Sequence, residues 1–199
     1  MEPLFTRMSV MENILAKIQS ATRLSEETIR ELRACVTPCH FPKNHLLIRS
    51  GGYCKYAYFI EKGFTRSFWV VDGEEITTSF LGEGGIVFSM DELYYQKPSE
   101  EYVETLEEVE GYRISIADLR RLWDTNFELC RWALAIHQDE YRRLHRSHRD
   151  RLALPAKERY EHFLQQFPGI EQRVNLGLIA SYLGITLSTL SRLRGKLKD

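Results

Sequence analysis

The last quarter of the chain contains its most constraining pattern, a short apolar repeat interrupted by one glycine. Ile179 and Leu183 recur at the spacing of a helix. Gly184 then interrupts the repeat, and Leu190 and Leu193 resume it. A glycine can adopt the positive φ that a tight turn between two helices requires. This stretch therefore predicts two short helices that meet at a tight turn, a helix-turn-helix.

The second of these helices presents a short, polar and basic face. Thr186 precedes it and offers a hydroxyl N-cap. Serine and threonine hydroxyls suit base edges and phosphates in a major groove, and arginine binds guanine O6 and N7 in a bidentate way. We therefore favour binding to double-stranded DNA over an ordinary helical hairpin. The candidate DNA-binding residues are Thr186, Ser188, Thr189, Ser191, Arg192 and Lys196.

The formal net charge of −1 hides an uneven distribution along the chain. Residues 1–125 contain 14 basic and 20 acidic side chains, whereas residues 126–199 contain 13 and 8. Between Gln172 and Lys198 there are five basic residues and no acidic one. Local positive charge of this kind displaces counterions from DNA phosphates. A solvated basic face would have the same composition, so charge adds only modest support.

Short β-branched and aromatic runs, separated by glycine at intervals of about ten residues, fill the middle of the chain. Asp72-Gly73 is the strongest hairpin signal among the separators. Because no helical pattern lies between the runs, they favour a closed antiparallel β-roll, jelly-roll-like, over an open parallel sheet. With helices expected between Val10 and Ala34 and again from Ser115, the fold class is α+β. The expected strands are 45–48, 56–60, 65–71, 75–81 and 102–106.

One long helix is expected from about Asn126 to Leu152, with an unbroken apolar seam at alternating spacings of three and four. Such a seam is best satisfied by a partner helix, which predicts a homodimer; packing onto the chain's own roll is the alternative. The predicted domains are a sensor domain at 1–125, a dimerisation helix at 126–152 and a DNA-binding domain at 153–199. The candidate dimer-interface residues are Phe127, Cys130, Leu134, His137, Tyr141, Leu144 and His148.

In this order of elements the chain resembles the Crp/Fnr family of bacterial transcription regulators. The most specific segments are 45–63 in the roll and 179–192 at the C-terminal end. The resemblance implies a cyclic-nucleotide-binding-like sensor roll, homodimerisation through the long helix, and DNA binding that recruits or blocks RNA polymerase. Arg192 occupies a position where the family commonly has a base-contacting arginine. Leu187 and Ser188 stand where many members have a basic and an acidic residue, so a different operator sequence is expected.

The ligand site departs further from the family pattern. Members that bind cyclic AMP hold its phosphate with a Gly-Glu element and an arginine, and here Ser99 or Glu100 replaces that arginine. Eight acidic residues lie between Ile86 and Tyr112 against Lys97 alone. Losing a charge-assisted contact and gaining like charge costs several kcal/mol, so we predict no micromolar affinity for cyclic AMP. An uncharged or cationic effector, or none, is compatible with this. The candidate ligand-binding residues are Phe88, Ser89, Asp91, Glu92, Ser99 and Glu100.

Metal and catalytic sites are not expected. The four cysteines are separated by gaps of 3, 14 and 75 residues, unlike the compact spacing of iron–sulfur ligands. The spacing of histidines and carboxylates suggests neither a metal site nor a catalytic triad. We therefore predict a regulator without a cofactor rather than an enzyme. No apolar run approaches the length of a membrane span, and the N-terminus lacks an apolar signal core, so the expected location is the cytoplasm, with no membrane partner.

The alternative function is a sensor module that acts through protein contacts, with the C-terminal helices as an interface. Salt dependence separates the two. Phosphate neutralisation by lysine and arginine predicts a steep loss of DNA affinity with salt, and a protein-interaction surface does not.

Overall fold

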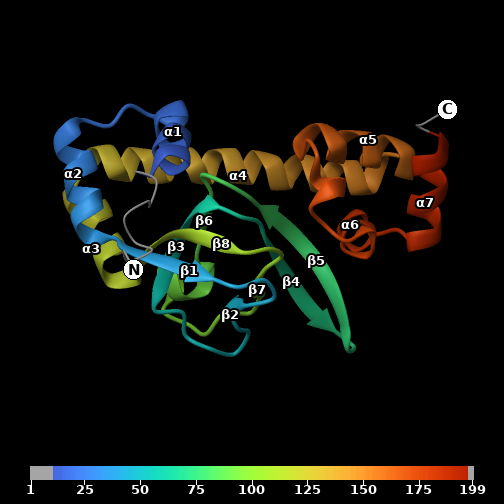
Figure 1. Ribbon diagram of the computed structural model, residues 1–199, viewed down its shortest axis with the longest axis horizontal. Coiled ribbons are helices and arrows are strands. Elements are labelled where there is room, and N and C mark those ends of the chain that lie inside the picture. The colour runs from blue at the N-terminus through green and yellow to red at the C-terminus, as the bar shows by residue number, and fades with distance from the viewer. Residues whose placement is uncertain (1–10, 197–199) are drawn as a thin grey trace, which may run out of the picture.

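A computed structural model describes residues 11–196 as a β-roll, a long helix that crosses it, and a small helical domain at the C-terminal end (Figure 1). The helical elements are α1 (Glu12–Ala21), α2 (Glu26–Cys35), η2 (Asp91–Tyr95), α3 (Ile116–Thr125), α4 (Phe127–Ala153), α5 (Ala156–Gln166), η3 (Ile170–Gln172), α6 (Leu176–Leu183) and α7 (Leu187–Lys196). The strands are β1 (Thr37–Phe41), β2 (Leu46–Ile48), β3 (Tyr56–Lys62), β4 (Thr65–Val71), β5 (Glu74–Leu81), β6 (Ile86–Val87), β7 (Tyr102–Thr105) and β8 (Val109–Ser115).

The roll consists of two four-stranded antiparallel sheets. One has the strand order β1-β8-β3-β6 and the other β2-β7-β4-β5. Their inward faces share a core that includes Ile60, Val87 and Val103. The predicted hairpin joins β4 to β5, and both Asp72 (φ 53°) and Gly73 (φ 83°) adopt the left-handed conformation of a two-residue turn. The antiparallel roll and the α+β class are therefore confirmed.

The sequence prediction missed three strands. β1 contains Pro38, which cannot donate to a sheet ladder, and the structure places β1 at the edge of its sheet, where proline is tolerated. β8 alternates buried and exposed residues but contains Glu110 and Gly111, which weaken its signal. Gly111 is needed there, because a Cβ at this position would lie 2.0 Å from the carbonyl oxygen of Phe59 on β3. β6 is only two residues long.

Helices α1, α3 and α4 cover the first sheet. Ser25 caps α2 through the amide of Thr28, and Ser115 caps α3 through the amide of Asp118. One buried cluster that includes Leu129 joins these helices to the sheet, and in it Trp132 of α4 stacks on Phe59 of β3. The long helix is thus fixed to the roll by one of its faces.

The C-terminal domain packs against the end of β5 and not only upon itself. Its core of α5, α6 and α7 residues also includes Phe64, Phe80 and Leu106 from the roll. Phe80 is 2% exposed, and its ring centroid lies 5.4 Å from that of Tyr182 and 6.0 Å from that of Phe163. The roll and the helical domain therefore share an aromatic core.

Polar contacts reinforce this junction. The amide of Thr77 on β5 donates to the hydroxyl of Ser181 on α6 at 3.0 Å. Arg173 bonds Glu83 at 2.7 Å and also pairs with Glu107, both in the roll. Hydrogen bonds to Glu83 and Glu107 raise the pKa of Arg173 above its ordinary value, so the arginine stays charged. Together these contacts position the helix-turn-helix relative to the roll.

Among the described residues, no single helix is both long and apolar enough to cross a membrane. Taken together, α6 and α7 are long and apolar enough for a membrane span, but the two helices are bent by 102° relative to each other.

Candidate functional site

The helix-turn-helix has the geometry that the glycine-interrupted repeat predicted. Gly184 ends α6 in the left-handed conformation (φ 64°). The 102° bend between α6 and α7 lies within the range of about 90–120° typical of DNA-binding helix-turn-helix motifs. The hydroxyl of Thr186 accepts from the amide of Thr189 at 3.2 Å, which is the predicted N-cap. Leu190 is fully buried and fixes α7 against the domain core.

The polar face of α7 points away from that core. Ser188, Ser191 and Arg192 are exposed, and Thr189 is half-buried. Arg192 donates to the Thr189 hydroxyl at 3.3 Å and is not held by a carboxylate among residues 11–196. Lys196 ends α7, but its side chain lies outside the described part of the chain. The structure thus leaves Ser188, Ser191 and Arg192 of the predicted DNA-binding set accessible on α7; contact with DNA stays a prediction.

Two of the nearby basic residues are engaged within the protein. Arg173 pairs with Glu83 and Glu107, and Arg194 lies 2.6 Å from Glu171. The sequence count of five basic residues in this segment therefore overstates the charge available to DNA. Arg192 is the described arginine of this segment that remains free for a groove contact.

The predicted seam follows the face of α4 that turns away from the chain's own roll. Phe127, Leu134, Tyr141 and Leu144 are 74%, 57%, 72% and 48% exposed. Cys130 is exposed in the single chain too. The roll instead packs against Leu129, Trp132 and Ala133. The alternative that the roll covers the seam is therefore wrong for most of its length.

His137 is the seam residue that does contact the roll. Its Nε2 lies 2.6 Å from the hydroxyl of Tyr94 in η2, and its Nδ1 lies 2.6 Å from the carbonyl of Ala133. Its ring also packs near Phe88. Burial raises the pKa of Tyr94 to about 12, so its hydroxyl keeps its proton. The segment next to the candidate ligand site thus contacts the seam directly.

The candidate ligand residues separate into two groups. Asp91 accepts from the amide of Glu100 at 2.9 Å, and buried Ser99 is held by backbone bonds to Gly51 and Gly52. Fully buried Ser89 caps the amide of Glu92 at 3.3 Å. Phe88 lies apart from both groups and packs toward His137. No basic side chain takes the place of the missing arginine in the predicted set.

The sequence analysis missed Glu101 at this site. Its amide donates to the Ser99 hydroxyl at 3.2 Å. Burial, followed by the charge of Asp91, raises the pKa of Glu101 to about 7. The counts of acidic residues in this segment already contained it, but only the fold places its carboxyl beside Asp91. The site is acidic, as predicted, and it contains more closely packed carboxyl groups than expected.

No metal centre forms within residues 11–196, where no three histidine, cysteine, aspartate or glutamate side chains approach closely enough to hold an ion. Burial raises the pKa of the Cys39 thiol to about 11 and also raises that of Cys54. These two thiols are therefore poor nucleophiles at neutral pH.

Comparison with known proteins agrees with this architecture. Residues 38–126 match the cyclic nucleotide-binding domain family. The c-di-GMP-responsive regulator CLP of Xanthomonas campestris superposes with a TM-score of 0.68 at 20% identity, covering 87% of this chain and 92% of CLP. FixK2 of Bradyrhizobium japonicum gives 0.71 at 20% identity, with coverage of 82% and 84%. A CooA variant of Carboxydothermus hydrogenoformans gives 0.70 at 17%, with coverage of 94% and 84%.

Among curated proteins, no sequence matches this one. The resemblance seen in the sequence is confirmed at the level of the fold by the family match and the superpositions together. Residues 38–126 match the cyclic nucleotide-binding domain family, and the whole chain has the fold seen in Crp/Fnr family regulators.

Proposed function

We propose that this chain is a homodimeric, DNA-binding transcription regulator whose roll does not bind cyclic AMP. The observation that carries the proposal is that one chain has both an accessible polar face on α7 and an uncovered apolar seam on α4. Polar residues of α7 face solvent, and the seam of α4 leaves large apolar side chains exposed. A two-fold dimer through the seam would present two copies of α7 to half-sites about one helical turn apart.

An exposed run of aromatic and aliphatic side chains on a long helix supports dimerisation. Phe127, Leu134, Tyr141 and Leu144 continue along the helix at heptad spacing. Monomeric proteins rarely leave such a continuous apolar stripe in water. A second copy of the same helix fits the stripe, because a two-fold axis brings identical residues together.

The DNA-binding part of the proposal predicts a selection result. Fragments selected from random DNA by the full chain should contain an inverted repeat. In the Arg192→Ala variant one base position in each half-site should lose about 1–3 kcal/mol of discrimination, because a bidentate contact to a guanine is removed. The exposed Arg30 on α2, at the opposite end of the molecule, gives the matched control Arg30→Ala. An unchanged preference in Arg192→Ala would remove the role assigned to this arginine.

The ligand part of the proposal predicts that cyclic AMP does not bind with micromolar affinity. Its phosphate would meet Asp91, Glu100 and Glu101 without a compensating arginine. Calorimetric titration of the full chain with cyclic AMP checks this. The titration should be repeated at pH 6 and pH 8, because Glu101, with its pKa of about 7, adds a further negative charge at the higher pH. Micromolar binding at either pH contradicts the prediction.

A further inference from the structure

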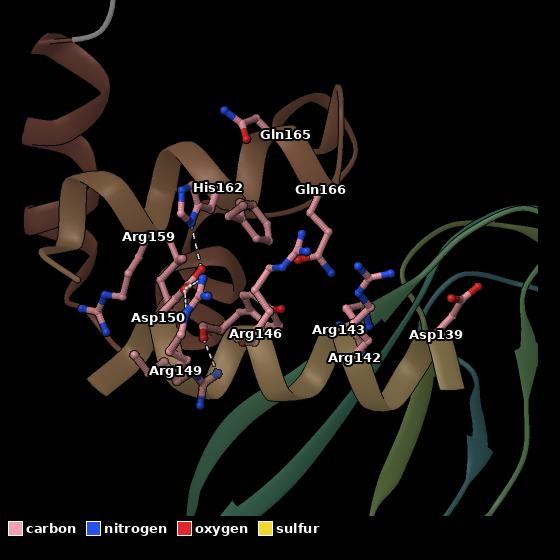
Figure 2. Close-up of a pocket in the computed structure, with 15 residues that line it drawn as sticks. Asp139, Arg142, Arg143, Arg146, Arg149, Asp150, Arg159, His162, Gln165 and Gln166 are labelled. Carbon is pink, nitrogen blue, oxygen red and sulfur yellow. Dashed lines mark hydrogen bonds and ion pairs between the residues drawn. The ribbon is translucent and has the colours of Figure 1, made fainter. Parts of the chain in front are cut away.

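An arginine-rich groove opens between α4, α5 and α6, away from both candidate sites described above (Figure 2). Its volume is about 710 Å³, which falls within the range of small-molecule sites. Two aspartates, Asp139 and Asp150, are the acidic residues that line it. The lining arginines are Arg142, Arg143, Arg146, Arg149, Arg151 and Arg159.

The acidic residues neutralise only part of this charge. Asp150 is engaged by His162 and by Arg149, each at 2.8 Å. Although burial acts to raise the pKa of Asp150, the hydrogen bonds from His162 and Arg149 outweigh it and hold this pKa below its ordinary value. Asp139 lies at the far end of the groove from Asp150 (Figure 2). Most of the guanidinium charge therefore has no anion within the described protein.

Two guanidinium groups also have a buried donor outside hydrogen-bond geometry. Arg143 pairs with Glu140, donates to the Ser79 hydroxyl at 3.0 Å and interacts with the Tyr182 hydroxyl, but its buried Nη1 has no acceptor in hydrogen-bond geometry. The Nε of Arg159 is likewise buried and unpaired. Arg146 extends from α4 across the groove toward α5 (Figure 2). A buried donor without an acceptor is unfavourable, and an incoming acceptor would remove that penalty.

We propose that this groove binds a phosphorylated small molecule carrying at least two negative charges. Guanidinium groups remain charged at all physiological pH values, and their planar donor pairs match phosphate oxygens in a bidentate way. Phe163 and Tyr182 supply an apolar wall for the organic part of such a ligand. Nucleoside di- and triphosphates and inorganic pyrophosphate share the required chemistry.

The groove is separate from the polar face of α7 that carries the candidate DNA-binding residues. Of the described residues, none from α7 lines it, and Tyr182 and Leu183 of α6 stand between the groove and α7. Because the lining comes from α4 on one side and from α5 and α6 on the other, a bound ligand would link the long helix to the C-terminal domain. The inference does not depend on DNA binding.

Calorimetry of the full chain with sodium pyrophosphate and with ATP, at about 0.15 M ionic strength, tests the proposal. We expect binding of both, weakened at least about tenfold by Arg146→Gln, because a charge-assisted contact is lost. Arg142→Gln, also exposed in the free groove, provides a second variant if the first alters folding. Arg30→Gln on α2 removes the same charge elsewhere and should leave the affinity unchanged.

Three results would overturn the proposal. Absence of binding by both pyrophosphate and ATP would show that the groove has no phosphate site. Equal weakening by Arg30→Gln would mean that only overall charge matters. If the protein does not bind pyrophosphate and Arg146→Gln binds a random DNA duplex more weakly than the wild type, the groove contacts the DNA backbone and not a small molecule.

Discussion

Replacing Leu134 with glutamate should convert the protein to a monomer and abolish tight operator binding. Leu134 lies in the middle of the seam and is 57% exposed in the single chain, so the fold itself should tolerate the change. In a dimer the new carboxylate would be buried opposite its own copy without a partner. This costs about 3–5 kcal/mol, which raises the dimer dissociation constant by at least about a hundredfold.

Analytical ultracentrifugation over a range of concentrations measures this dissociation constant. Gln138→Glu adds the same charge on the same helix, outside the seven seam residues, and should leave the dimer largely intact. Circular dichroism should give the same helix content for both variants. If Leu134→Glu remains dimeric at the wild-type concentration, the seam is misassigned and the homodimer must form elsewhere.

Replacing Phe80 with alanine should destabilise the protein by about 3–5 kcal/mol, because the cavity forms in a fully packed aromatic cluster. Phe80 belongs to β5, but its ring packs against Phe163, Phe167 and Tyr182 of the C-terminal domain. The loss of stability should therefore be concentrated at the junction between the roll and the helix-turn-helix. We expect increased hydrogen exchange in α5 and α6 and little change in α1 and α3.

Urea denaturation gives the free energy of unfolding for this variant. Val70→Ala on the neighbouring strand is the matched control, because Val70 is 49% exposed and should cost no more than about 0.5 kcal/mol. A loss below about 1 kcal/mol for Phe80→Ala, with unchanged exchange in α5 and α6, would mean that the two parts of the chain are not coupled through this ring.

Local patterns predicted those elements whose signals are contained in a few neighbouring residues. The hairpin at Asp72-Gly73, the N-cap at Thr186 and the turn at Gly184 depend on backbone conformations that single residue types favour. The structure has each of them at the predicted position. β4 has the predicted bounds, 65–71, because its β-branched and aromatic run ends at clear turn signals.

Features that depend on distant segments could not be read in this way. β1 is stabilised by pairing with β8, some seventy residues later, which overrides the proline in its sequence. The raised pKa of Glu101 depends on its burial beside Asp91. The arginine groove forms only because α5 folds back along α4. In the sequence those arginines are spread over two helices, α4 and α5, and no local pattern shows that they come together.

Recognition of DNA by two copies of α7 is tested by the salt dependence of duplex binding. Affinity of the purified dimer for a random duplex should fall linearly with salt on a log–log scale, with a slope near −0.9 per phosphate neutralised. Because Arg173 and Arg194 are held by carboxylates, we expect a slope that reflects only a few phosphates per protomer. A protein that is monomeric and binds no duplex at low ionic strength would contradict the account.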